Sequence, residues 1–120
     1  MRYMLLIYGD EKKRDAMSDG EKGAMFKEYG EFTEGIRKSG AFQAGDPLQP
    51  VGAATTVRAK NGKTVATDGP FAETKEQLGG YYIVEAKNRD EAVAIAARIP
   101  AVRVGGSVEV RPIMEMGASH

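Results

Sequence analysis

The chain opens with an apolar run in which odd and even positions are equally hydrophobic. This run, Tyr3–Tyr8, predicts a central strand covered on both sides, because successive side chains of a strand point to opposite faces. The charged stretch Glu11–Asp15 is expected to be a solvated loop. The run is too short for a signal-peptide core or a membrane span, so the cytoplasm is the expected location and no membrane association is expected.

A long amphipathic helix is predicted next. Ser18 and Glu21 have the spacing of a capping box, in which the two side chains satisfy backbone donors at the start of a helix. Gly40 is a suitable residue just beyond its end. The apolar positions between them share one helical face, which we interpret as core: Met25, Tyr29, Phe32 and Ile36.

The middle of the chain is predicted to be mostly extended. Phe42–Pro50 is strand-like, and the Thr/Val-rich runs Ala54–Lys60 and Lys63–Asp68 flank Asn61-Gly62, the favoured two-residue hairpin turn. Ala72–Leu78 is compatible with a short helix, which the following Gly-Gly pair would break.

The last third repeats the alternation of strand and helix. Tyr81–Ala86 predicts a strand, and Asn88 with Glu91 marks the start of a second helix, which Pro100 is expected to stop. The final strand is expected over Ser107–Glu115, and its proline favours an edge position.

The predicted element order, β-α-β-β-β-β-α-β, indicates one domain over residues 1–120. Two helices against one antiparallel sheet fit the ferredoxin-like α+β arrangement. Helices on one face leave the other face uncovered, and Tyr81 and Tyr82 point to opposite faces, so one is expected in the core and the other at an interface. We therefore expect a homodimer.

Composition excludes several kinds of function. Lys+Arg and Asp+Glu are both 17, so the net charge is zero, and the basic excess typical of nucleic-acid binding is missing. Cysteine is absent and the one histidine is His120, which leaves no zinc site and no histidine-based triad within the body of the chain. No phosphate-loop or dinucleotide motif is present, and we expect no metal and no cofactor.

The densest polar cluster follows the second hairpin strand. Asp68 precedes a turn made rigid by Pro70, and partial burial there would raise the pKa of the carboxyl and suit it to proton transfer. We assign it as the candidate catalytic residue. The candidate substrate-binding residues around it are Arg58, Glu73, Lys75, Glu76 and Tyr81. Arg58 would serve as an anion clamp.

A structural interpretation of the same cluster is equally open. Asp-Gly-Pro is common turn chemistry, in which the carboxylate accepts hydrogen bonds from nearby amides. Glu73 and Glu76 would then favour the first turn of a short helix through its dipole.

The stretch Asp68–Glu76, DGPFAETKE, continued by Gln77–Glu85, resembles the DGPF branch of the YCII-related family. The opening MRYMLLIYGDE, the middle segments Gly45–Pro50 and Thr55–Arg58, and the ending Val108–Ile113 resemble it too. The resemblance implies a ferredoxin-like fold paired face to face into a dimeric α+β barrel.

For activity the resemblance implies less. Many members carry an Asp and a His together in a cleft and have been suspected of catalysis, and some relatives resemble lyases or isomerases of ring-derived small molecules. Asp68 matches the Asp, but no internal histidine matches the His. Genes of the DGPF branch are often adjacent or fused to those of extracytoplasmic-function sigma factors, which implies a regulatory link.

Three hypotheses follow. The chain is a lyase or isomerase in which Asp68 moves a proton; or it is a non-catalytic, dimeric module that binds a small-molecule ligand or a regulator; or DGPFAETKE is a folding device. In the third case, Asp68→Asn would cost about 0.5–2 kcal/mol of stability and change nothing else.

Overall fold

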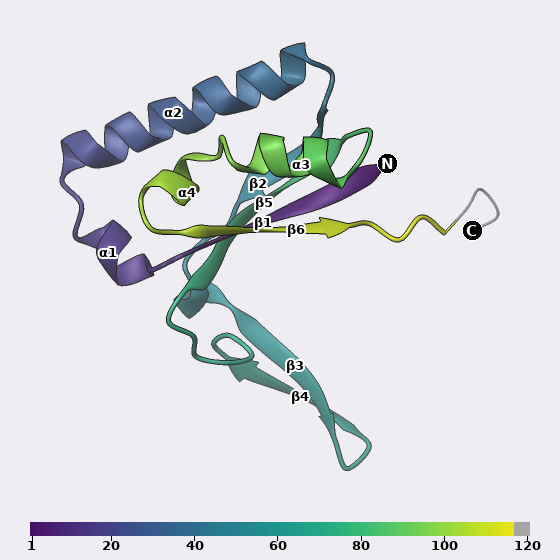
Figure 1. Cartoon of the computed structure of the whole chain (residues 1–120). Coiled ribbons are helices and arrows are strands. Elements are labelled where there is room, and N and C mark those ends of the chain that lie inside the picture. Colours follow the sequence, from purple (N-terminus) through teal and green to yellow (C-terminus); the bar gives the residue numbers. More distant parts are fainter. Residues whose placement is uncertain (117–120) are drawn as a thin grey trace.

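Four strands form one antiparallel sheet in the computed structural model, which describes residues 1–116 (Figure 1). In sheet order they are β2 (Phe42–Pro47), β5 (Gln77–Glu85), β1 (Arg2–Gly9) and β6 (Ser107–Pro112). One face of the sheet carries the helices α2 (Asp19–Lys38), α3 (Arg89–Ala96) and α4 (Pro100–Arg103). The six strands, α2 and α3 follow the predicted order, α1 and α4 are additional, and the mixed α+β architecture is compatible with the ferredoxin-like class.

The core lies between the central strands and the helices. Leu5 of β1, Val84 of β5 and Ile36 of α2 are 0% exposed and belong to the same core cluster. Side chains of the other parity in β1 and β5 point away from the helices, because neighbours along a strand face opposite sides. Within residues 1–116, no helix covers that second side of the sheet (Figure 1).

The first long helix begins as predicted and is buried only in its second half. Ser18 Oγ accepts from the Glu21 amide at 3.1 Å and Glu21 Oε1 accepts from the Ser18 amide at 3.0 Å, which completes the capping box. Gly40 follows the helix with φ +83°, a conformation that glycine adopts without strain. Of the predicted core face, Phe32 and Ile36 are buried, whereas the part of α2 before them lies over a groove.

Two local predictions around the first strand and the fifth were wrong. Glu11–Asp15 forms a short helix, α1, because Asp10 Oδ1 accepts from the Lys12 amide at 2.9 Å and caps it. Ala72–Leu78 forms no helix. Its end belongs to β5, where Gln77 pairs with Gly9 of β1, so the glycines at 79 and 80 lie inside a strand.

The C-terminal elements match the prediction with shifted boundaries. The Asn88 side chain caps α3, as its Oδ1 accepts from the Glu91 amide at 2.9 Å. Pro100 does not stop this helix, which has already ended at Ala96. It occupies the first position of α4, where its missing N–H costs nothing. Strand β6 ends at Pro112, earlier than expected, and is an edge strand as predicted.

A second sheet leaves the body of the molecule as a hairpin of β3 (Thr55–Lys60) and β4 (Lys63–Asp68), which follows the short 3-10 helix η1 (Val51–Ala53). We call Thr55–Asp68 the arm. Its turn is the predicted one, with φ +53° at Asn61 and +77° at Gly62. The radius of gyration is 16.5 Å, larger than the roughly 13.6 Å typical of a compact chain of this length, because the arm projects.

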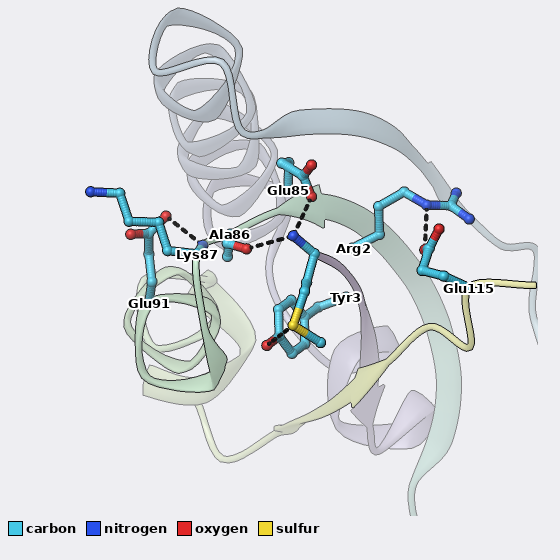
Figure 2. Close-up of polar contacts among 8 residues, drawn as sticks. Arg2, Tyr3, Glu85, Ala86, Lys87, Glu91 and Glu115 are labelled. Carbon is cyan, nitrogen blue, oxygen red and sulfur yellow. Dashed lines mark hydrogen bonds and ion pairs between the residues drawn. The ribbon is translucent and has the colours of Figure 1, made fainter. Parts of the chain in front are cut away.

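The sheet end opposite the arm is held by polar contacts between distant parts of the chain (Figure 2). The Met1 ammonium lies 3.0 Å from Glu85 Oε2 and donates to the Ala86 carbonyl at 3.0 Å. Arg2 Nε donates to Glu115 Oε1 at 2.9 Å, which joins the segment after β6 to the start of β1. Because these contacts close this end of the sheet, a site is to be sought at the other end, where β1 finishes and β5 begins.

Candidate functional site

A groove of about 1330 Å³ lies between α2 and the end of the sheet where β1 finishes and β5 begins. Its wall on the helix side includes Met25, Phe26, Tyr29 and Thr33, and its floor includes Gly45 and Tyr82. A concave surface that is mainly apolar and carries a few polar groups is the usual form of a small-molecule site. We call it the α2 groove.

A chain of hydroxyl groups crosses the α2 groove from helix to sheet. Thr33 Oγ1 donates to the Tyr29 carbonyl at 2.8 Å and lies 2.6 Å from the Tyr82 hydroxyl. Since threonine has one hydroxyl proton, and Tyr29 accepts it, Tyr82 donates to Thr33. The Tyr82 oxygen therefore keeps acceptor capacity, and its ring is fixed in place.

The shape of the floor depends on glycine. A Cβ at Gly45 would lie 2.5 Å from Cδ1 of Tyr82, so the ring occupies the space that any other residue at this position would need. At the neighbouring Gly79, a Cβ would lie 3.4 Å from an Arg14 guanidinium nitrogen, which places Arg14 against the floor. Arg14 is also 3.9 Å from Glu11 Oε2.

The Tyr29 phenol is a groove hydroxyl whose acidity is altered by burial. Burial raises its pKa above the ordinary value of 10, and nearby Tyr82 adds to this; the Ala101 backbone and the Arg14 charge act in the opposite direction. Tyr29 is therefore a neutral phenol across the physiological pH range. It can donate a hydrogen bond to a ligand without carrying charge.

A second polar pair lies at the edge of the groove. The Tyr81 hydroxyl donates to Asp46 Oδ2 at 2.7 Å, and this hydrogen bond is the main reason that the pKa of Tyr81 is raised. The two residues are paired across β5 and β2, so their side chains share the face of the sheet opposite the helices. As predicted, Tyr81 and Tyr82 point to opposite faces, and Tyr82 is the buried one.

The structure divides the predicted site into two groups. Lys75 and Glu76 line the α2 groove, and Tyr81 borders it with its side chain on the opposite face of the sheet. Asp68 ends β4 on the arm, where its side chain is exposed, and it does not border the groove. The partial burial considered for its carboxyl is thus not found in the single chain.

The other two predicted residues lie with Asp68. Arg58 is exposed on β3 and uses a guanidinium nitrogen to donate to the Phe71 carbonyl at 2.9 Å, so it holds the DGPF segment to the arm. Glu73 is exposed in the loop between β4 and β5. The proposed roles of these residues in catalysis or substrate binding remain predictions.

Tyr29, Thr33 and Arg14 were not predicted as site residues, because each fits another interpretation of its sequence context. Tyr29 was interpreted as core from its helical spacing, and Arg14 as part of a solvated loop. Thr33 gave the one usable signal, because it is a polar residue four positions after Tyr29 on the same face of the helix.

The described residues hold few other features that point to a site. Within residues 1–116 no cluster of three or more potential metal ligands occurs. No helix in this part of the chain has the length and apolarity to cross a membrane. His120, on which the sequence argument against a triad turned, lies outside the described residues.

Fold and groove together define a ferredoxin-like α+β protein with an open groove between its long helix and its sheet. The chain belongs to the YCII-related domain family, whose model matches residues 1–117. It is similar to an uncharacterized protein of Rhizobium meliloti (strain 1021), with 36% identity over 114 residues that cover 94% of this chain and 92% of the relative. The resemblance inferred from the DGPF motif is therefore confirmed at the level of the family.

Proposed function

We propose that the protein is a ligand-binding module that takes a small organic molecule into the α2 groove. The observation that carries the proposal is the fixed hydroxyl chain from Thr33 to Tyr82 on an otherwise largely apolar wall. Ligand binding to such a site has a small entropic cost, because the polar groups of the site are already held in place.

The groove lining indicates the chemistry of the ligand. Met25 and Phe26 offer apolar surface, which favours a flat or aliphatic body. Arg14 is a charged hydrogen-bond donor, and the neutral Tyr29 phenol can donate its O–H. The matching ligand carries a carboxylate or carbonyl oxygen at one end of an apolar body.

The protein is proposed to act as a homodimer, the dimeric α+β barrel expected from the sequence. The side chains of the sheet that point away from the helices form what we call the open face. Its apolar centre consists of Met4, Leu6, Tyr8, Tyr81 and Ile83. Large apolar patches of this kind usually mark an interaction surface.

Ligand binding is tested with three small probes of one shape: benzoate, benzyl alcohol and benzylamine. We expect benzoate to raise the melting temperature and to shift the amide resonances of Gly45 and Gly79, because binding to the folded state alone stabilises it. Arg14→Ala and Tyr29→Phe should weaken the benzoate effect by about tenfold in affinity each. Arg89→Ala, which removes an exposed arginine from α3, is the matched control.

Two results would refute the binding proposal. One is that none of the probes shifts the groove resonances at millimolar concentration. The other is that Arg89→Ala weakens benzoate binding as much as Arg14→Ala does, since nonspecific attraction to any arginine would then explain the effect.

A lyase or isomerase that uses Asp68 as acid or base is the second candidate. The observation in its favour is that Lys75 and Glu76, two of the predicted substrate-binding residues, line the groove. Turnover of a panel of cyclic lactones tests it. Catalysis by Asp68 predicts a fall of roughly 10²–10⁴-fold in Asp68→Asn. Equal turnover in the variant would remove Asp68 from the mechanism. The sigma-factor link stays a prediction from the resemblance.

A further inference from the structure

The arm has no core of its own. Every residue of β4 is exposed, as is every residue of β3 except Thr56. Val57 in the middle of β3 is 62% exposed. An isolated two-stranded hairpin is at best marginally stable in water. A hairpin of this length with a well-formed turn therefore needs a further surface to pack on.

One face of the arm is already in use. Thr56 Oγ1 donates to the Gly69 carbonyl at 2.8 Å, and Arg58 donates to the Phe71 carbonyl, so the DGPF loop folds over this side. The opposite face holds small and apolar side chains at its centre. They are Val57, Ala59 and Ala66, and all three are exposed.

The direction in which the arm leaves the sheet indicates which surface it can contact. In Figure 1 the helices lie on one side of the four-stranded sheet and the arm leaves on the other side. That is the side of the open face, where the proposed second copy sits. A second copy seated on the open face therefore lies beside the arm.

The open face suits a second copy of the same chain. A twofold dimer sets one surface against itself, so its rim needs charges of both signs. The rim of the open face has them, with Glu109 and Arg111 on β6 and Asp46 on β2. The net charge of zero adds no long-range repulsion between copies.

The flat area of the sheet alone is smaller than the area that a standard interface buries. Four strands spaced about 4.8 Å apart and about 26 Å long present a flat area of roughly 500 Å². A standard interface buries about 800 Å² on each partner. The contribution of the two arms brings the contact closer to that size.

We infer that the arm of each chain clasps a second copy, with Val57, Ala59 and Ala66 packed on the partner. The inference rests on the proposed dimer. It adds a function to the arm, and it gives Asp68 a different environment, because Asp68 shares the face that holds Val57. The carboxylate that is exposed in one chain is covered in the pair.

The mass of three variants, measured by light scattering over a range of concentrations, tests the inference. Leu6→Asp alters the open face, Val57→Asp the arm, and Val93→Asp an exposed valine of α3 as the matched control. We expect the native protein to have a molar mass of twice 12.9 kDa. Val57→Asp should raise the dimer dissociation constant by about 10- to 100-fold, because it places a charge in a buried contact.

A second measurement does not depend on disruption of the arm. The chain has no cysteine, so Val57→Cys and Val93→Cys each introduce a single thiol. The maleimide labelling rate of Val57→Cys should fall about tenfold as the protein concentration rises through the dimer range, whereas that of Val93→Cys stays constant.

The outcomes separate the inference from the proposals beneath it. If Leu6→Asp gives monomers while Val57→Asp dimerises like the native chain and the Val57→Cys thiol stays reactive, the clasp is wrong and the dimer stands. A native chain that is monomeric at every concentration overturns both. The benzoate experiment tests the groove independently of either result.

Discussion

The four-stranded sheet and the arm are both antiparallel β-structure, but they are stabilised in different ways. Leu5 in β1 is 0% exposed under the helix layer, whereas Val57 in β3 is 62% exposed. The sheet is held by burial, and the arm by its turn and by hydrogen bonds to the loop that follows it. A strand can therefore be fully formed and still contribute no core, in which case its role is to be sought outside its own chain.

The largest expected effect separates the two regions directly. Leu5→Ala should destabilise the protein by about 3 kcal/mol, because it removes a buried side chain and leaves a cavity. Val57→Ala, measured by urea unfolding at a concentration where the chain is monomeric, should change stability by no more than about 0.5 kcal/mol. Similar losses in the two variants would show that the arm is part of the core.

A glycine substitution tests the packing of the groove floor. Gly45→Ala should cost about 1–3 kcal/mol, because the new methyl group overlaps the Tyr82 ring and displaces it from Thr33. Gly52→Ala is the control, since a Cβ there meets nothing within 4 Å. Thermal unfolding compares the pair, and a harmless Gly45→Ala would contradict the packing described.

The turn of the arm should matter locally. Gly62→Ala places a Cβ in the left-handed region at φ +77° and should cost roughly 1 kcal/mol there. Amide hydrogen exchange measures this effect. The amides of β3 and β4 should exchange faster than in the native protein, while those of β1 keep their native rates. Faster exchange in β1 would mean that arm and sheet unfold as one unit.

The start of α2 has a pH-dependent stability. Hydrogen bonding to the Ser18 backbone lowers the pKa of Glu21 below its ordinary value of 4.5. The resulting stabilisation is present at neutral pH and is lost as the pH falls through the lowered pKa. Acid titration followed by far-UV circular dichroism should show a greater loss of helix in the native chain than in Glu21→Gln, which titrates no proton there.

The smallest expected effect concerns the residue that the sequence singled out. Asp68→Asn should alter monomer stability by less than about 0.5 kcal/mol, because the side chain is exposed. Chemical denaturation of the two proteins checks this. A loss nearer 2 kcal/mol would favour the folding-device hypothesis instead.

Sequence reasoning succeeded where short-range chemistry decides the structure. The capping box at Ser18 and the turn at Asn61-Gly62 depend on neighbouring residues alone, and both form as predicted. It failed at Ala72–Leu78, because pairing with β1 outweighs the local helical tendency. For Tyr29 it was right in part: the residue packs against the core, but it is only partly buried and also lines the groove, which helical spacing does not show.

The two outer strands have consequences for how copies of the chain can meet. β2 and β6 each finish on a proline, Pro47 and Pro112, which has no N–H to offer a neighbouring strand. Growth of the sheet by lateral strand addition, the route to fibrils, is therefore hindered at these ends. Association across the flat surface has no such obstacle, and it stops by itself once that surface is used.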